Sequence, residues 1–184
     1  MNWKEYLPLS EKTLSTEFHC SKKEELLLHG VMGILTELDE LLDSNDDSVN
    51  KEEEIADSFW YLAILDREIN LNFTLDSNVD ETDDLKRKTS DELVLLMYKK
   101  TSTLLDFLKK KLYYNKQIDL NRFSEISNEL FNLFIYFSTR NNIDISSALD
   151  RNISKLKARY GDKFTSERAI NRNLDIERNI LEGN

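Results

Sequence analysis

The sequence predicts an all-α protein: a four-helix bundle core built from two helical hairpins, with an extra C-terminal helix and a basic tail. Glycine and proline are scarce, at four and one among 184 residues, and this favours long helices. Apolar residues recur every three or four positions through four long segments, and no segment alternates apolar and polar residues as a strand does. Apolar residues make up 40% of the chain, enough for one core, so we expect residues 1–184 to form a single domain.

The first hairpin is expected within residues 22–69. Its first helix begins after a capping box, in which Ser21 and Glu24 stand three residues apart. A polar turn is expected over 43–49, because this stretch has no apolar residue before its last position. A second helix follows over about 51–69 and groups three aromatic residues in one stretch: Phe59, Trp60 and Tyr61.

The second hairpin is expected within residues 91–140. Before it, the charged stretch 76–90 predicts a loop or a ragged helix end. The third helix begins at another capping box, Thr89 with Glu92, and is expected to end at a basic bend over 109–114. The fourth helix carries apolar residues at helical spacing: Phe123, Ile126, Leu130, Leu133, Phe134 and Phe137.

A shorter helix is predicted over 146–160, and the tail after it is expected to be irregular, with a helical turn or two near 168–181. The C-terminal segment 151–184 is basic, with eight lysines and arginines against five acids. The two hairpins resemble each other in length and order. We therefore interpret 22–75 and 91–150 as pseudo-repeats, although any two helical hairpins share this pattern.

The formal charge of −10 disfavours stable binding to nucleic acid or to an anionic membrane. No apolar run approaches the roughly 18 residues that span a bilayer. The lone Cys20 excludes an internal disulfide and fits a reducing compartment. The first residues do not read as a secretory signal, so a cytoplasmic location is expected.

Two acidic pairs are the most informative feature of the chain: Glu37 with Glu40, and Glu54 with Asp57. Residues three apart lie on one side of a helix, so two adjacent helices would direct four carboxylates into one space. Four anions repel strongly unless a multivalent cation lies between them. An all-oxygen shell favours a hard ion, Mg²⁺ or Mn²⁺.

Gly30 and Gly33 precede the first acidic pair on the same helical face. Glycine costs about 1 kcal/mol in a helix interior, so two of them indicate close approach by a ligand or by a neighbouring helix. The alternative is an ordinary solvated helix face, since other acids such as Asp39 and Glu52 lie nearby. Periodicity alone therefore predicts a candidate divalent-cation site.

Three stretches resemble the motifs of one family. The stretch 29–42 (HGVMGILTELDELL) resembles the first motif of the MazG-like nucleotide pyrophosphohydrolases, in the all-α NTP pyrophosphatase superfamily. The stretch 53–63 (EEIADSFWYLA) resembles their second motif, and 152–164 (NISKLKARYGDKF) resembles their C-terminal segment. Residues 171–178 are similar to the tails of short members. The three motifs occur in order over most of the chain.

The resemblance implies Mg²⁺-dependent cleavage of a nucleoside triphosphate between the α and β phosphates, which releases a monophosphate and pyrophosphate. It implies four metal ligands and catalytic residues: Glu37, Glu40, Glu54 and Asp57. It also implies contacts from the basic tail to phosphate or base: Lys155, Arg159 and Tyr160. Lys110 of the basic bend is expected to bind the distal phosphates, and Trp60 or Tyr61 is a candidate for stacking on the base, with a core position as the alternative. His29 is expected to be a packed or capping residue, and His19 and Cys20 to be structural.

One departure from the family pattern is informative. Short members carry a basic bend between the two acidic helices, whereas here the turn at 44–48 is acidic and the basic stretch is at 109–116. The second hairpin offers no acidic pair at the equivalent positions: Lys100, Thr103, Ile126 and Glu129. We interpret the chain as a fused, diverged duplication with one composite site. Relatives usually pair, so a homodimer is an alternative to a self-sufficient chain.

Three other functions fit the sequence less well. A catalytically weak protein of the same fold would bind or sequester nucleotides without turnover. A di-iron bundle needs a Glu-x-x-His pair on each of two helices, and neither His19 nor His29 is placed in this way. A purely structural helical adaptor would show no Mg²⁺-dependent thermal shift with a non-hydrolysable triphosphate.

Overall fold

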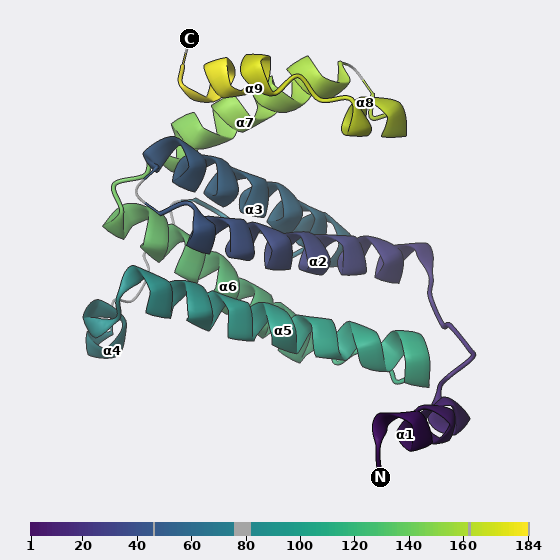
Figure 1. The fold of residues 1–184 in the computed structure, drawn as a ribbon. Coiled ribbons are helices and arrows are strands. Elements are labelled where there is room, and N and C mark those ends of the chain that lie inside the picture. Colours follow the sequence, from purple (N-terminus) through teal and green to yellow (C-terminus); the bar gives the residue numbers. More distant parts are fainter. Residues whose placement is uncertain (46, 76–81, 162, 184) are drawn as a thin grey trace.

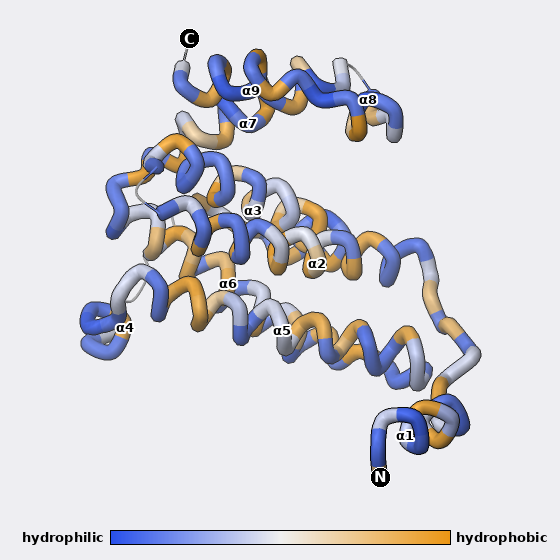
Figure 2. Tube along the Cα trace, in the orientation of Figure 1, coloured by the Kyte–Doolittle hydropathy of each residue, from blue (hydrophilic) through white to orange (hydrophobic). Residues whose placement is uncertain are grey.

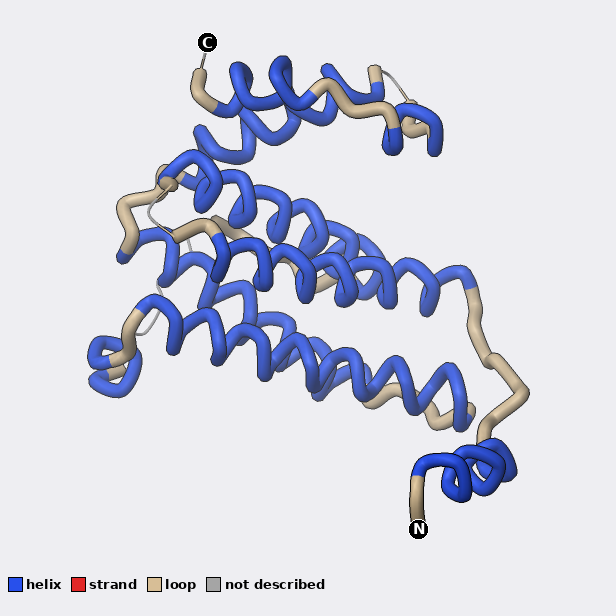
Figure 3. Tube along the Cα trace, viewed as in Figure 1, coloured by secondary structure: helices blue, strands red, loops and turns tan. Residues whose placement is uncertain are grey.

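A computed structural model describes residues 1–45, 47–75, 82–161 and 163–183. The described residues form helices, turns and loops and no strand (Figure 3), so the predicted all-α class is confirmed. Four long helices form the bundle: α2 (Lys22–Asp43), α3 (Ser48–Ile69), α5 (Ser90–Tyr114) and α6 (Leu120–Arg140). None of the helices among the described residues combines the length and apolar character that a membrane crossing requires.

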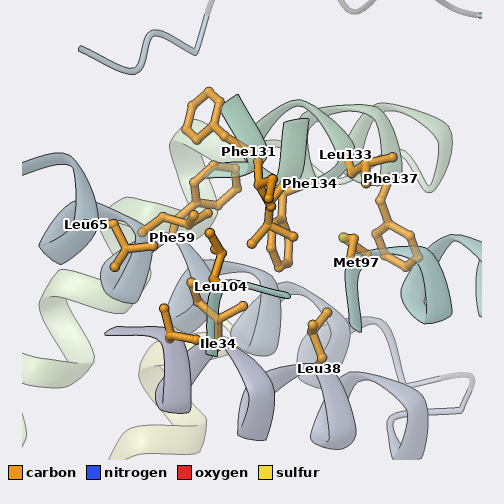
Figure 4. Packing of buried hydrophobic residues seen from close by; sticks show 14 of the residues in the cluster. Ile34, Leu38, Phe59, Leu65, Met97, Leu104, Phe131, Leu133, Phe134 and Phe137 are labelled. Carbon is orange, nitrogen blue, oxygen red and sulfur yellow. The ribbon is translucent and has the colours of Figure 1, made fainter. Parts of the chain in front are cut away.

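The bundle is built from two hairpins stacked on each other, as predicted. Helix α2 packs against α3 and α5, and α6 packs against α5 and α3 (Figure 1). In Figure 2, the bundle helices alternate between apolar and polar colours, as expected of helices with one buried face. Aromatic rings of α3 and α6 fill the centre: Phe59 lies 5.5 Å from Phe131 and 6.0 Å from Phe134 between ring centroids (Figure 4).

Side-chain caps explain where the helices begin and end. The predicted capping boxes at Ser21 and Thr89 are both present. Asp47 caps α3, where its carboxylate accepts hydrogen bonds from the amides of Val49 and Asn50. Helix α3 therefore begins at Ser48, inside the turn predicted over 43–49. Helix α5 ends at Asn115, which takes the left-handed conformation with φ 51°.

The predicted basic bend over 109–114 is wrong, because α5 continues through Tyr114. Asp106 accepts ion pairs from Lys109 at 2.7 Å and from Lys110 at 2.5 Å, one turn further along the helix. Such pairs at three- and four-residue spacing stabilise a helix. Leu112 is also buried. The three consecutive lysines at 109–111 are therefore part of α5, and the turn between α5 and α6 follows Tyr114.

Two short segments lie outside the predicted hairpins. Helix α1 (Trp3–Ser10) and a 3₁₀ turn (Glu11–Thr13) lie apart from the bundle and have no buried residue (Figure 1). They are tied to it where the His19 amide donates to the Leu112 carbonyl at 2.7 Å. Within the stretch 76–90, α4 (Asp83–Arg87) is a single helical turn, and residues 76–81 lie outside the described part of the chain.

The C-terminal segment covers one side of the bundle. Helix α7 (Ile145–Tyr160) agrees with the predicted helix and packs on α3, and α8 (Ser166–Ile170) and α9 (Leu174–Leu181) return along α7 (Figure 1). The tail is therefore more regular than expected. Arg178 of α9 donates to Asn50 at 2.6 Å and to Asp47 at 3.2 Å, so the end of the chain returns to the start of α3.

Gly33 allows the close contact between α2 and α3. A Cβ atom built at this position would lie 2.2 Å from Cε1 of Tyr61, and one at Gly30 would lie 3.2 Å from the Tyr61 carbonyl oxygen. We expect Gly33→Ala to lower the free energy of unfolding by about 1–2 kcal/mol, because overpacking exceeds the gain in helix propensity. Urea unfolding measures the change, with the exposed neighbour Met32→Ala as a near-neutral control. A Gly33→Ala protein as stable as the parent would contradict this account of the α2–α3 contact.

Candidate metal and phosphate site

The four predicted acids come together at the α2–α3 contact. Glu37, Glu40, Glu54 and Asp57 all line one cavity of about 600 Å³. Carboxylate oxygens of Glu37, Glu54 and Asp57 lie within 4.8 Å of one another. Glu37 and Glu54 are buried, Asp57 is half-buried, and Glu40 is exposed at the mouth of the group. Three oxygen donors this close match the ligand type that Mg²⁺ and Mn²⁺ prefer.

Glu37 and Glu54 are held in a form that retains a proton. Burial raises the pKa of both carboxyls well above the ordinary value of 4.5, and the charge of Glu40 raises both further. Carboxylate oxygens of the two side chains lie within 4.8 Å of each other, and their interaction lowers the pKa of Glu37 and raises that of Glu54, so the proton is favoured on Glu54. A bound cation would remove the need for this proton, because it would neutralise the charge that burial disfavours.

These raised pKa values predict a pH dependence for the metal-free protein. The folded protein retains a proton that the unfolded chain releases above about pH 4.5, so the free energy of unfolding falls as pH rises from there. We expect a steady loss of stability between about pH 5 and about pH 8 in chelator-treated protein, measured by urea unfolding. Glu54→Gln should flatten the profile. A stability that rises with pH over this range in the parent protein would contradict the assignment.

An aromatic group forms the wall next to the acids. His29, Trp60 and Tyr61 line the cavity, and the ring centroids of His29 and Tyr61 are 5.5 Å apart and those of Trp60 and Tyr61 5.0 Å apart. Trp60 is 39% exposed and is therefore not a core residue. Burial, followed by the charges of Glu37 and Asp57, raises the pKa of Tyr61 to about 12, so its phenol is neutral. His29, expected to be a packed or capping residue, is exposed at this wall.

A second wall of the cavity is basic and comes from α7 and the segment that follows it. Arg159 and Tyr160, both predicted, line the cavity together with three cationic residues that were not predicted: Lys157, Lys163 and Arg172. The guanidinium carbon of Arg159 lies 5.7 Å from the ring centroid of Tyr160. Acids and cations that line one cavity match what a complex of a divalent cation and a polyphosphate needs.

Lys155 is not at the cavity surface, where it was expected to bind substrate. It is fully buried, and its ammonium lies 2.6 Å from Asp57 Oδ2 and 3.0 Å from Glu53 Oε1. Burial alone would lower the pKa of Lys155, but the charges of Asp57 and Glu53 outweigh it and the pKa is raised. Asn152 donates its amide to the other carboxylate oxygen of Asp57. Helix α7 is thus fastened to α3 through a residue of the acid cluster.

Lys110 does not line the cavity. It lies in the last turns of α5 and pairs with Asp106, away from the acid cluster on α2 and α3. Among the second-hairpin positions expected to match the acids, Lys100 and Glu129 form an ion pair and Ile126 is buried. In the described part of the chain, Glu37, Glu54 and Asp57 are the one cluster of three acids close enough to hold an ion.

Comparison with protein-family models, with curated proteins and with solved structures finds no match to this chain. The resemblance to MazG-like pyrophosphohydrolases therefore rests on the motif residues alone, and membership of that family stays a prediction.

Several cavity residues were missed, for different reasons. Glu53 belongs to neither acidic pair. Its ion pair with Lys155, a residue far away in the sequence, connects it to the site. Lys157, Lys163 and Phe164 stand within the motif-like stretch 152–164, so a reading of that whole stretch would have included them. Arg172 lies in the stretch 171–178, which resembles the tails of short members, but this tail was expected to be irregular and Arg172 was not assigned to the site.

Proposed function

We propose that the protein is a Mg²⁺-dependent nucleoside triphosphate pyrophosphohydrolase that converts a triphosphate to a monophosphate and pyrophosphate. The observation that supports this most is that the acid triad of α2 and α3 and cationic side chains from α7 and the following segment line the same cavity. Neither the acids alone nor the cations alone would select one class of ligand. Together they favour a ligand that brings a divalent cation and several phosphates into the same space.

The acids and the cationic side chains would bind different parts of the substrate complex. Glu37, Glu54 and Asp57 would hold the cation, with Glu40 completing the set from the cavity mouth. Bound magnesium would supply charge neutralisation at the α and β phosphates and lower the pKa of a coordinated water. Arg159 and its basic neighbours would orient the distal phosphates, since a guanidinium can donate two parallel hydrogen bonds to phosphate oxygens.

The reaction transfers the α phosphorus from the bridging oxygen to water. The water oxygen forms the new bond to the α phosphorus, the bond from that phosphorus to the α–β bridging oxygen breaks, and pyrophosphate leaves with the bridging oxygen. A carboxylate that the cation does not fully use would accept the proton that the water loses, and Glu40, the exposed acid of the four, is the candidate. Trp60, exposed at the aromatic wall, offers a face on which a base can stack.

A second candidate function is nucleotide binding without turnover. One observation favours it: Asn152 and Lys155 already bond to both carboxylate oxygens of Asp57, which reduces the donor capacity of that residue. The acid triad nevertheless stays within ion-binding distance in this arrangement. Pyrophosphate release over several hours distinguishes a slow enzyme from a binding protein.

The test is a panel of ribo- and deoxyribonucleoside triphosphates, assayed for released pyrophosphate with Mg²⁺ and with a chelator. We expect Mg²⁺-dependent release from at least one member, and the base and sugar preferences follow from the same panel. Thermal shift with a non-hydrolysable triphosphate and Mg²⁺ measures binding separately. A protein that neither cleaves nor binds any member of the panel would contradict both candidate functions.

A further inference from the structure

Glu177 is a buried carboxylate at the end of the chain. It lies on α9 and is 3% exposed, although acids in terminal helices are usually solvated. Two guanidiniums enclose it. Arg159 of α7 donates its Nε to Oε1 at 2.9 Å and its Nη2 to Oε2, and Arg172 donates its Nη2 to Oε2 at 2.7 Å.

Both arginines also line the candidate phosphate cavity. The bonds to Glu177 use the Nε and Nη2 edge of each guanidinium. The Nη1 group of each arginine takes no part in these bonds. One carboxylate therefore determines both the separation of the two guanidiniums and the edge that each can present.

Removal of the carboxylate would leave two like charges side by side with no common partner. They would repel each other, and Arg172, whose side chain is 40% exposed, would turn toward solvent. Burial would raise the pKa of Glu177, but hydrogen bonds from Arg159 and Arg172 lower it overall, so the carboxylate remains ionised. The three side chains act as a unit with a net charge of +1.

We propose that Glu177 is a positioning residue that holds Arg159 and Arg172 in place for the distal phosphates of the substrate. The inference rests on the proposed function. It assigns α9 a role in substrate affinity that does not involve the acid triad. Changes at Glu177 should therefore alter the affinity for phosphates and leave the affinity for the cation unchanged.

The test compares Glu177→Gln with the parent protein and with Glu182→Gln, a change at the exposed acid that follows the last residue of α9 and pairs with Arg178. We expect Glu177→Gln to raise the KM for the preferred triphosphate and the Kd for inorganic pyrophosphate by about tenfold, which corresponds to about 1.4 kcal/mol of binding free energy. The value of kcat and the affinity for Mn²⁺ alone should stay the same, and Glu182→Gln should change none of these quantities. Unchanged or tighter pyrophosphate binding by folded Glu177→Gln would overturn the proposal.

A second variant covers the case in which Glu177→Gln releases α9, as detected by limited proteolysis after α7. Arg172→Gln leaves the Arg159–Glu177 pair in place and should still weaken pyrophosphate binding, whereas parental affinity in this variant would overturn the proposal. The two hypotheses fail in different ways. A parent protein that binds no triphosphate contradicts the proposed function, and a parent protein that binds while both variants match it contradicts only the role of Glu177.

Discussion

Replacement of Glu54 by glutamine is expected to abolish Mg²⁺-dependent pyrophosphate release without unfolding the protein. Glu54 is buried and belongs to the acid triad, so its loss removes a charged cation ligand at the centre of the site. Metal stabilisation of a phosphoryl-transfer transition state supplies several kcal/mol, so kcat/KM should fall by roughly a thousandfold or more. Steady-state rates on the preferred triphosphate, with Mg²⁺ in excess, measure the effect.

The stability of this variant separates a functional role from a structural one. Glutamine has the shape of the protonated carboxyl that burial favours at Glu54, so we expect the metal-free variant to be at least as stable as the parent at neutral pH. Glu129→Gln is the control at an acid outside the site, because Glu129 stands at the second-hairpin position that corresponds to Asp57 and forms an ion pair with Lys100. Turnover of Glu54→Gln within tenfold of the parent would remove Glu54 from the site.

Replacement of Lys155 by methionine is expected to give the largest loss of stability among single changes on α7. The ammonium is fully buried and joins Asp57 and Glu53, and removal of one partner of a buried ion pair typically costs about 3–5 kcal/mol. Both acids keep some access to water, so we expect about 3 kcal/mol. Urea unfolding measures the loss, and limited proteolysis should show that α7 leaves the bundle before α2 and α3 unfold.

Lys157→Met is the control for this prediction. Lys157 lies two residues away on the same helix and is exposed, so the change should alter the free energy of unfolding by less than about 0.5 kcal/mol. A Lys155→Met protein as stable as the Lys157→Met protein would show that the ion pairs between α7 and α3 do not hold α7 on the bundle.

Local sequence patterns were sufficient to predict the helices of the bundle and the acidic residues that line the cavity. The acids could be predicted because each pair shares a helix face, and because a short turn brings the two helices together. Gly30 and Gly33 indicated a close approach, and the structure identifies the neighbour as α3. The capping boxes located the starts of two helices for the same local reason.

The basic wall of the cavity depends on contacts between distant parts of the chain. Lys155 looked like a surface cation because its partners lie about a hundred residues earlier, and no local spacing distinguishes a buried lysine from an exposed one. Glu177 was missed in the same way, since only the return of α9 along α7 brings it to Arg159. The basic stretch at 109–114 was predicted to be a bend, whereas ion pairs from Lys109 and Lys110 to Asp106 one turn earlier stabilise it as helix.

The most direct test of the central claim is the identity of the products. Phosphorus NMR of a reaction with the preferred triphosphate and Mg²⁺ distinguishes the possible cleavage sites in one spectrum. The proposed function predicts a nucleoside monophosphate and pyrophosphate, in equal amounts, with no diphosphate intermediate. A nucleoside diphosphate and orthophosphate, or an unchanged triphosphate, would contradict it.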